Sequence, residues 1–285
     1  MGTLIGRTDD VSIATSPPPS SKRHDVMKYD SYVICTSPRS GSTLLCKLLA
    51  ATGVAGNPKS YFHEPSIADW LEYAGAGPCD LADERYALET VFKAVLAKGS
   101  LDTGMFGLRL QRHSFNFFIR KLAVRCPGFS CDVERLQAAF GRTAFIHLTR
   151  RDKVEQAVSF VKAMQTGLWH RAPDGTELER LAPPQEPVFD PAEIGKHVEV
   201  FTAYDRQWES WFAEERIEPI RMTYEALSSD PAGTLRRLLE DLGLDGKAAS
   251  GIAPGVAKLA DSTNQDWVAR FRSEKDDAER RMENG

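Results

Sequence analysis

Eight consecutive residues, 36–43, have the composition of a site that binds an oxyanion. Their sequence is Thr-Ser-Pro-Arg-Ser-Gly-Ser-Thr, in which small residues surround a single cation, Arg39. The apolar residues that follow recur at helical spacing, so the run is expected to lead directly into a helix. Loop amides, a helix N-terminus and a guanidinium together stabilise a negatively charged oxygen. The candidate binding residues are Ser37, Pro38, Arg39, Ser40, Gly41, Ser42 and Thr43.

This run differs from the P-loop of nucleotide hydrolases, which has the pattern G-x-x-x-x-G-K-[ST]. That pattern requires glycine at position 36 and lysine at position 42, where this chain has Thr36 and Ser42. A kinase with a degenerate loop is one alternative interpretation of the run. A module that binds a nucleotide without catalysis is another.

A second basic turn follows the same plan later in the chain. The expected strand 144–148 ends at Arg150 and Arg151, and Asp152 is placed to cap the helix that follows. Ser159 lies on that helix, eight residues after Arg151. Taken alone the pair is ambiguous, because an arginine often precedes a helix and a serine can hydrogen-bond a carbonyl one turn back.

The two motifs together resemble those of sulfotransferases, which move a sulfuryl group from 3′-phosphoadenosine-5′-phosphosulfate (PAPS) to a hydroxyl or amine. In these enzymes the first motif is the 5′-phosphosulfate loop. An arginine and a serine eight residues apart bind the 3′-phosphate of the donor, which implies this role for Arg151 and Ser159. The stretch Tyr224-Glu225-Ala226-Leu227 resembles a further motif of the superfamily.

Among sulfotransferases, the chain most resembles the bacterial trehalose 2-sulfotransferase and lipopolysaccharide sulfotransferase family, over most of 32–272. The resemblance implies PAPS as co-substrate and no metal. The acceptor is expected to be a carbohydrate hydroxyl of trehalose, a glycolipid or a lipopolysaccharide sugar. Related enzymes are often dimers, so a homodimer is expected from this resemblance. A bacterial origin is expected because the family is bacterial.

The residue that removes the proton from the acceptor is where this chain departs from the family. The trehalose enzymes resemble it through 56–62, but their proposed base is a glutamate where this sequence has Ser60, and a serine is no base at neutral pH. Four residues later, Tyr-Phe-His-Glu-Pro resembles the Glu-Pro segment of sulfotransferases that modify glycans. The resemblance favours Glu64 as the base, with His63 as the alternative. Arg39 would stabilise the charge that develops during transfer.

Two further residues are candidates for substrate binding. Arg109 falls where related enzymes carry a basic residue near the substrate. Trp169 has a ring that could stack on a sugar or on adenine. An exposed strand arginine and a tryptophan that packs at a helix end are the alternative interpretations.

These residues need a framework that brings the two basic turns together. Runs that favour β-strands occupy 32–36, 105–111, 144–148 and 220–224. Helical spacing of apolar residues marks 82–98, 115–125, 194–212 and 231–243. This alternation predicts an α/β fold with a P-loop-like, mainly parallel sheet flanked by helices on both faces. Ligands bind at the carboxyl ends of such strands, so both turns are expected to share one crevice.

Composition excludes several classes of protein. The 40 acidic and 36 basic residues leave a net charge of −4, which argues against a nucleic-acid binder. No run approaches the roughly 20 apolar residues of a membrane span. The five cysteines form no C-x-x-C pair, so neither a disulfide framework nor a zinc site is expected. With no signal peptide in evidence, the expected compartment is the cytoplasm.

The expected domain organisation is simple. Residues 1–30 are rich in Ser, Pro and charged residues, which predicts a disordered tail. Residues 31–285 are then expected to form a single domain, within which 172–191, rich in Pro, Glu and Asp, would be a surface excursion.

Overall fold

The computed structural model describes residues 28–63, 65–77, 79–257 and 259–283 of the chain. At its centre is a four-stranded parallel sheet with the strand order β2-β1-β3-β6. The strands are β1 (Ser31–Thr36), β2 (Phe106–Gln111), β3 (Thr143–Thr149) and β6 (Ile220–Thr223). This sheet confirms the predicted α/β class, and the expected strand near 105–111 takes the edge position beside β1.

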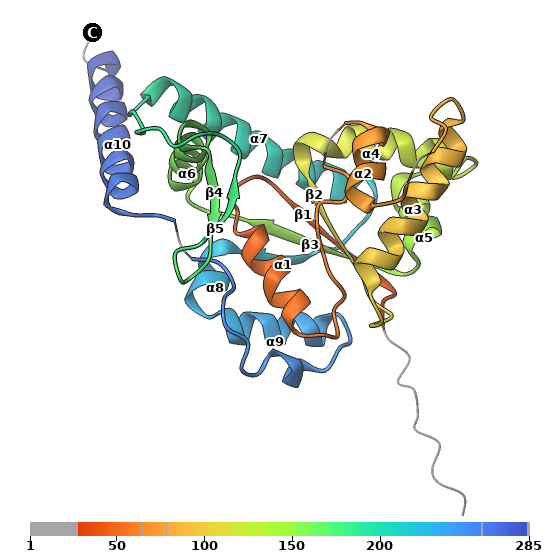
Figure 1. Ribbon diagram of the computed structural model, residues 1–285. Helices are drawn as coiled ribbons and strands as arrows, with labels where there is room; N and C mark the ends of the chain where they lie inside the picture. Colours follow the sequence, from red (N-terminus) through yellow and green to blue (C-terminus); the bar gives the residue numbers. More distant parts are fainter. Residues whose placement is uncertain (1–27, 64, 78, 258, 284–285) are drawn as a thin grey trace, which may run out of the picture.

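Helices cover both faces of this sheet (Figure 1). On one face lie α1 (Ser42–Ala51), α8 (Tyr224–Ser229), α9 (Pro231–Asp241) and the short 3-10 helix η1 (Gly246–Ala249). On the other lie α2 (Ile67–Ala74), α3 (Glu84–Ser100), α4 (Arg112–Arg125), α5 (Asp132–Phe140) and α7 (Pro191–Glu214). A further layer joins α7 to α6 (Lys153–Thr166) and α10 (Ser262–Glu283).

The alternation of side chains along β1 connects two separate cores. Val33 and Cys35 belong to the core beneath α2, α3, α4, α5 and α7, whereas Tyr32 and Ile34 belong to the core beneath α1, α8 and α9. Every residue of β1 is buried, as expected for a parallel strand that is covered on both faces. The site at its carboxyl end is therefore carried by a rigid element.

The predicted surface excursion contains regular structure. A two-stranded antiparallel sheet pairs β4 (Leu168–Arg171) with β5 (Glu177–Arg180). A strand is usually recognised by alternating apolar and polar residues, of which the apolar ones are buried. In β5 three of the four residues are exposed, so no such alternation marks this strand in the sequence. This hairpin lies over the carboxyl end of the central sheet, beside the loop that follows β1 (Figure 1).

The start of the folded domain also differs slightly from the prediction. Residues 1–27 of the predicted tail lie outside the described residues, but 28–30 belong to the domain. Asp30 accepts hydrogen bonds from the backbone and side chain of Arg142, and this pairing lowers the pKa of Asp30 to about 2. The folded domain therefore includes residues 28–30, which the sequence had assigned to the tail.

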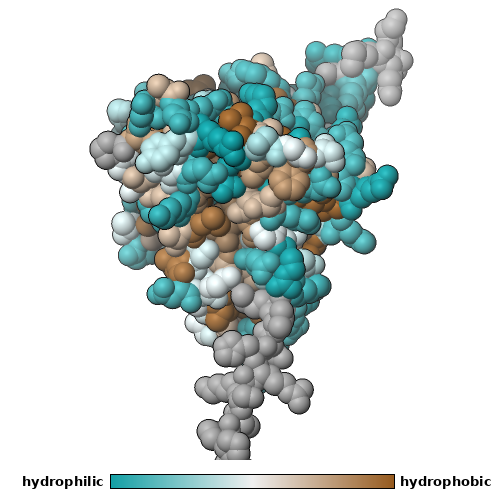
Figure 2. Space-filling model, turned by 90° about the vertical axis from the view of Figure 1, so that its right-hand side faces the viewer, coloured by the Kyte–Doolittle hydropathy of each residue, from teal (hydrophilic) through white to brown (hydrophobic). Residues whose placement is uncertain are grey.

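The face on the side of α3 and α5 carries many hydrophilic side chains (Figure 2). Figure 2, a view from the side of α3 and α5, shows polar side chains around scattered apolar ones. In the part of the chain that the structure describes, no helix is both long and apolar enough to cross a bilayer.

Candidate active site

The loop between β1 and α1 places the first motif at the carboxyl end of the central strand. Arg39 has a φ of 61° and Gly41 a φ of 84°, so the chain turns sharply twice within three residues. No side chain caps the α1 N-terminus, which begins immediately after Gly41. A Cβ atom on Gly41 would lie 2.5 Å from the ring of Tyr224, so both the backbone and the packing require glycine here.

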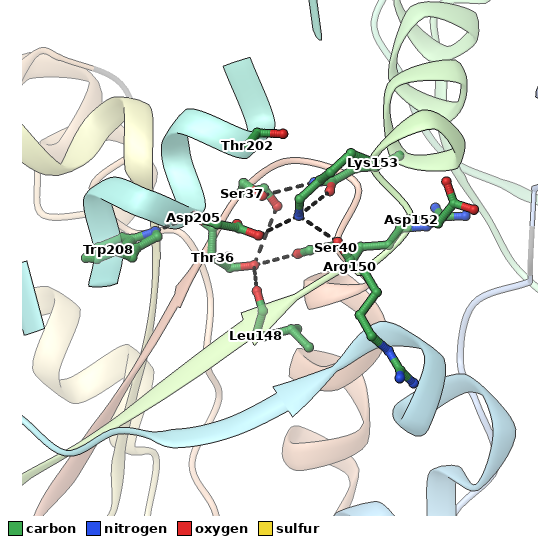
Figure 3. A network of polar contacts seen from close by, with 12 residues as sticks. Thr36, Ser37, Ser40, Leu148, Arg150, Asp152, Lys153, Thr202, Asp205 and Trp208 are labelled. Atoms are coloured by element: carbon green, nitrogen blue, oxygen red, sulfur yellow. Dashed lines mark hydrogen bonds and ion pairs between the residues drawn. The ribbon is translucent and has the colours of Figure 1, made fainter. Parts of the chain in front are cut away.

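The back of this loop is held by hydrogen bonds to the neighbouring strand and helices (Figure 3). Thr36 Oγ1 donates to the carbonyl of Leu148 at 2.8 Å and also contacts Ser40 Oγ. The indole of Trp208 donates to the Thr36 carbonyl at 3.0 Å. Ser37 and Ser40 are completely buried. The side chains of these two predicted binding residues therefore serve the architecture of the loop.

The front of the loop opens into a cavity of about 1020 Å³. Six of the predicted binding residues line it, five from the loop and one from α6, namely Pro38, Arg39, Gly41, Ser42, Thr43 and Ser159. Other walls come from β2, the end of β3, the β4–β5 hairpin, α2 and α7, and from Pro254, Val256, Ala257, Leu259 and Ala260. A cavity of this size is at the upper end of the range for small-molecule sites, so it has room for a nucleotide together with a second reactant.

Arg39 and Ser159, predicted separately, meet in this cavity. The guanidinium of Arg39 donates from Nε to Ser159 Oγ at 3.0 Å and from Nη1 to the Trp169 carbonyl at 2.6 Å. Burial, with a further contribution from the nearby charge of Arg150, lowers the pKa of Arg39 to about 10. Arg39 therefore stays protonated at neutral pH and supplies a concentrated positive charge.

Arg109 extends from β2 into the same cavity. Its Nη1 donates to Thr43 Oγ1 at 2.8 Å, and its Nε donates to Ser60 Oγ at 2.7 Å. The guanidinium thus joins the donor loop to the segment 57–60, which runs beside the edge strand. Ser60, at the position of the family glutamate, serves here as a hydrogen-bond acceptor for a cation.

The two arginines of the second turn face in different directions. Arg150 is 5% exposed, lines the cavity, and stacks on the ring of Tyr224 with 4.6 Å between its guanidinium carbon and the ring centroid. The side chain of Arg151, the residue predicted from the sequence, is 71% exposed and lies 3.6 Å from Glu225. Glu225 also accepts from the backbone of Arg151, which explains the Tyr-Glu motif at 224–225.

The direction of the Arg150 side chain can be inferred from the sequence of β3. Side chains alternate along β3, so the residue two positions after Leu148 faces the same side as that leucine. Leu148 lies in the core next to α1 and α8, the side on which the donor loop and Tyr224 also lie. Continuing the alternation past the strand end would have placed Arg150 toward the loop.

The cavity is also lined by aromatic and charged residues outside the loop 36–43. His63 lines the cavity and its ring lies 5.0 Å from that of His113. Burial, followed by the proximity of His63, lowers the pKa of His113 to about 4. Glu64, the predicted base, lies outside the described residues. Trp169 lines the cavity with its ring edge-on to Phe160.

His170 and Glu179 are cavity residues that sequence reasoning missed. His170 Nε2 lies 3.0 Å from Thr43 Oγ1 and 3.4 Å from Glu179 Oε2. Burial, and then the charges of Arg39, Arg109 and Lys47, lower the pKa of His170 to about 3. Both residues lie on the hairpin, more than 120 residues after the loop 36–43 that His170 contacts. No local sequence pattern indicates a contact across that separation. Among the described residues, no group of three or more His, Cys, Asp or Glu is arranged to hold a metal ion.

The chain is similar to known sulfotransferases over most of its length. The family model for Stf0 sulphotransferases matches residues 31–274. The chain is 29% identical over 265 residues to the trehalose 2-sulfotransferase of Mycobacterium tuberculosis (strain ATCC 35801 / TMC 107 / Erdman). It is 30% identical over 267 residues to the enzyme of the same name from Mycolicibacterium smegmatis. Each alignment covers 85% of this chain and 94% of the relative.

Two solved structures also match. One is a sulfotransferase from Alicyclobacillus acidocaldarius, with a TM-score of 0.40, 14% identity, and coverage of 85% of this chain and 91% of the other. The second is the sulfotransferase domain of the Synechococcus PCC 7002 olefin synthase, with a TM-score of 0.37, 14% identity, and coverage of 85% and 86%.

Proposed function

Because the chain belongs to the Stf0 sulphotransferase family, we propose that it transfers a sulfuryl group from PAPS to a carbohydrate hydroxyl. One observation carries the donor assignment. Three guanidinium groups, from Arg39, Arg109 and Arg150, converge on one cavity at the carboxyl ends of neighbouring strands. PAPS is a polyanion with phosphate or sulfate groups at both ends, and such groups are bound by arginine and by exposed helix amides.

The reaction is an in-line transfer between two oxygens. The acceptor oxygen forms a bond to sulfur while the bond from sulfur to the bridging phosphate oxygen breaks. The electron pair of that bond leaves with adenosine 3′,5′-bisphosphate, and the acceptor proton passes to a base. Positioning of the reactants and stabilisation of the developing charge supply most of the rate, as in phosphoryl transfer. Arg39, Arg109 and the amides at the start of α1 are the groups assigned to this stabilisation.

The base is one of two neighbouring residues. Glu64 is the first candidate because of the Glu-Pro resemblance, and His63, which lines the cavity, is the second. Replacing each with glutamine separates them, because only loss of the base removes the acidic limb of the pH profile of kcat. Loss of transfer in Glu64→Gln with retention in His63→Gln supports the first assignment. The reverse result supports the second.

The names of the relatives guide the choice of acceptor. Trehalose is the first sugar to test, followed by glycolipids and lipopolysaccharide sugars. The cytoplasmic location and the homodimer expected from the resemblance stay predictions.

Donor binding is tested by thermal stabilisation. Adenosine 3′,5′-bisphosphate is compared with ADP and with ATP plus Mg²⁺, and a ligand at 100 times its Kd is expected to add about 2.7 kcal/mol to the unfolding free energy. Selective stabilisation by the bisphosphate, followed by transfer of labelled sulfate to a sugar, is the expected outcome. Stabilisation by ATP alone would revive the kinase interpretation, and donor binding without transfer to any sugar would indicate a non-catalytic module.

A further inference from the structure

We propose that Lys153 is a positioning residue that holds the two halves of the donor site at a fixed separation without touching the donor. The proposal rests on the proposed function, since it assumes that the loop 37–43 and the turn 150–152 bind opposite ends of one nucleotide. Lys153 is the first residue of α6 and its side chain is only 17% exposed (Figure 3). It was not among the residues that the sequence singled out.

The ammonium group of Lys153 has three acceptors. Nζ lies 2.6 Å from the carbonyl oxygen of Arg150, 3.2 Å from Oε1 of Gln156 and 2.5 Å from Oδ2 of Asp205. An ammonium carries three donor hydrogens, so each of these contacts uses one. The carboxylate of Asp205 on α7 offsets the cost of removing this charge from water.

Through Gln156, Lys153 acts on the first half of the donor site. The Gln156 amide is completely buried, and its Nε2 donates to Ser37 Oγ at 3.0 Å and to the Pro38 carbonyl at 2.6 Å. Only the nitrogen end of the amide can make these two bonds, because an oxygen there would face the carbonyl oxygen of Pro38. Lys153, by donating to Oε1, fixes which end of the amide faces the loop.

Through the Arg150 carbonyl, the same ammonium acts on the second half. Arg150 begins the turn that follows β3 and points its guanidinium into the cavity. One partly buried charge therefore connects the backbone of this turn with the backbone of the loop, through Gln156. The α7 helix supports both ends of the connection, since it contributes Asp205 and also Trp208, which binds the Thr36 carbonyl.

This arrangement predicts a specific defect. A ligand that spans both halves depends on their separation, whereas a ligand that uses one half does not. Lys153→Met should weaken binding of adenosine 3′,5′-bisphosphate about tenfold or more and binding of AMP, which lacks the 3′-phosphate, by less than about threefold. Lys153→Arg, which keeps the charge, should restore bisphosphate affinity to within about threefold of the original protein.

Lys162→Met is the matched control. Lys162 also lies on α6, is also 17% exposed and also pairs with a carboxylate, that of Asp261, but it does not line the cavity or contact either turn. Both substitutions remove one partly buried ion pair, so both should lower the unfolding free energy. Only Lys153→Met should change the ratio of bisphosphate to AMP affinity.

The role of Lys153 is tested by calorimetric Kd values for the two ligands and by the unfolding free energy of each variant. Equal bisphosphate affinity in Lys153→Met and Lys162→Met would overturn the proposal, as would equal losses for bisphosphate and AMP. Should Lys153→Met fail to fold, Asp205→Asn gives the same test through the counterion, with an expected loss of about threefold for the bisphosphate alone. If the original protein bound no bisphosphate, the proposed function would fail and this inference with it.

Discussion

The donor side and the acceptor side of the cavity are built in different ways. The donor loop is short, continuous in sequence and held from behind by buried groups such as Thr36 and Gln156. The proposed acceptor side draws on α2, α4 and the hairpin, and it includes exposed side chains such as Tyr73, half of whose surface is exposed. A polyanionic donor common to a family requires a fixed site, whereas an acceptor site on solvent-facing residues can change without disturbing the core.

The largest expected effect tests the donor side directly. Arg39→Ala removes the buried cation of the loop and should lower sulfate transfer about 100- to 1000-fold, the range seen when one group that stabilises a developing charge is lost. Transfer from labelled PAPS measures it. Arg237→Ala, which removes a largely exposed arginine on α9, is the control and should stay within about twofold. Comparable losses in both variants would mean that the loop has no special role.

The second test compares the two arginines of the turn after β3. Arg150→Ala should weaken binding of adenosine 3′,5′-bisphosphate about 30- to 100-fold, because it removes a buried charge that lines the cavity. Arg151→Ala should cost less than about threefold, since that side chain is exposed and paired with Glu225. A larger loss in Arg151→Ala would support the role that the family resemblance implies for Arg151.

A third test concerns the rigidity of the donor loop. Gly41→Ala forces a left-handed residue to carry a Cβ atom against Tyr224, and should cost about 2 kcal/mol of unfolding free energy. Gly53→Ala is the control, because Gly53 also has a positive φ but has nothing within 4 Å of an added Cβ. That change should cost about 1 kcal/mol. Urea denaturation of both variants measures the difference, and equal costs would show that the Tyr224 contact yields easily.

The smallest effect concerns pH and the hairpin. The pKa of His170 is about 3 in the folded protein and near 6.5 in the unfolded chain, so the unfolded state binds a proton more readily between these values. Stability should therefore fall as pH drops from about 6.5 toward 3, with about 1 to 2 kcal/mol attributable to this residue at pH 5. Comparing His170→Gln with the original protein at pH 7 and pH 5 isolates it. An unchanged pH dependence in the variant would contradict the assignment.

The sequence was most informative about the loop 36–43, because the pattern there is local. The run 36–43 was recognisable from eight adjacent residues, whereas Ser159, which the resemblance paired with Arg151, is hydrogen-bonded to Arg39. Arg109 was identified through resemblance, but not its bond to Thr43, 66 residues away. The hairpin was missed because β5 is too exposed and charged to show the strand alternation.

What the sequence determined by itself was the order of the four central strands and of the longer helices, and the position of the run 36–43 between a strand and a helix. Both follow from short-range patterns, because apolar periodicity fixes elements and loop composition fixes what a turn can bind. The tertiary structure alone decided that the side chain of Arg151 lies beside Glu225, 74 residues later, and does not line the cavity. It also decided that Lys153 is paired with Asp205, a residue 52 positions later. Such choices depend on which distant elements pack together, and the local sequence carries no record of that packing.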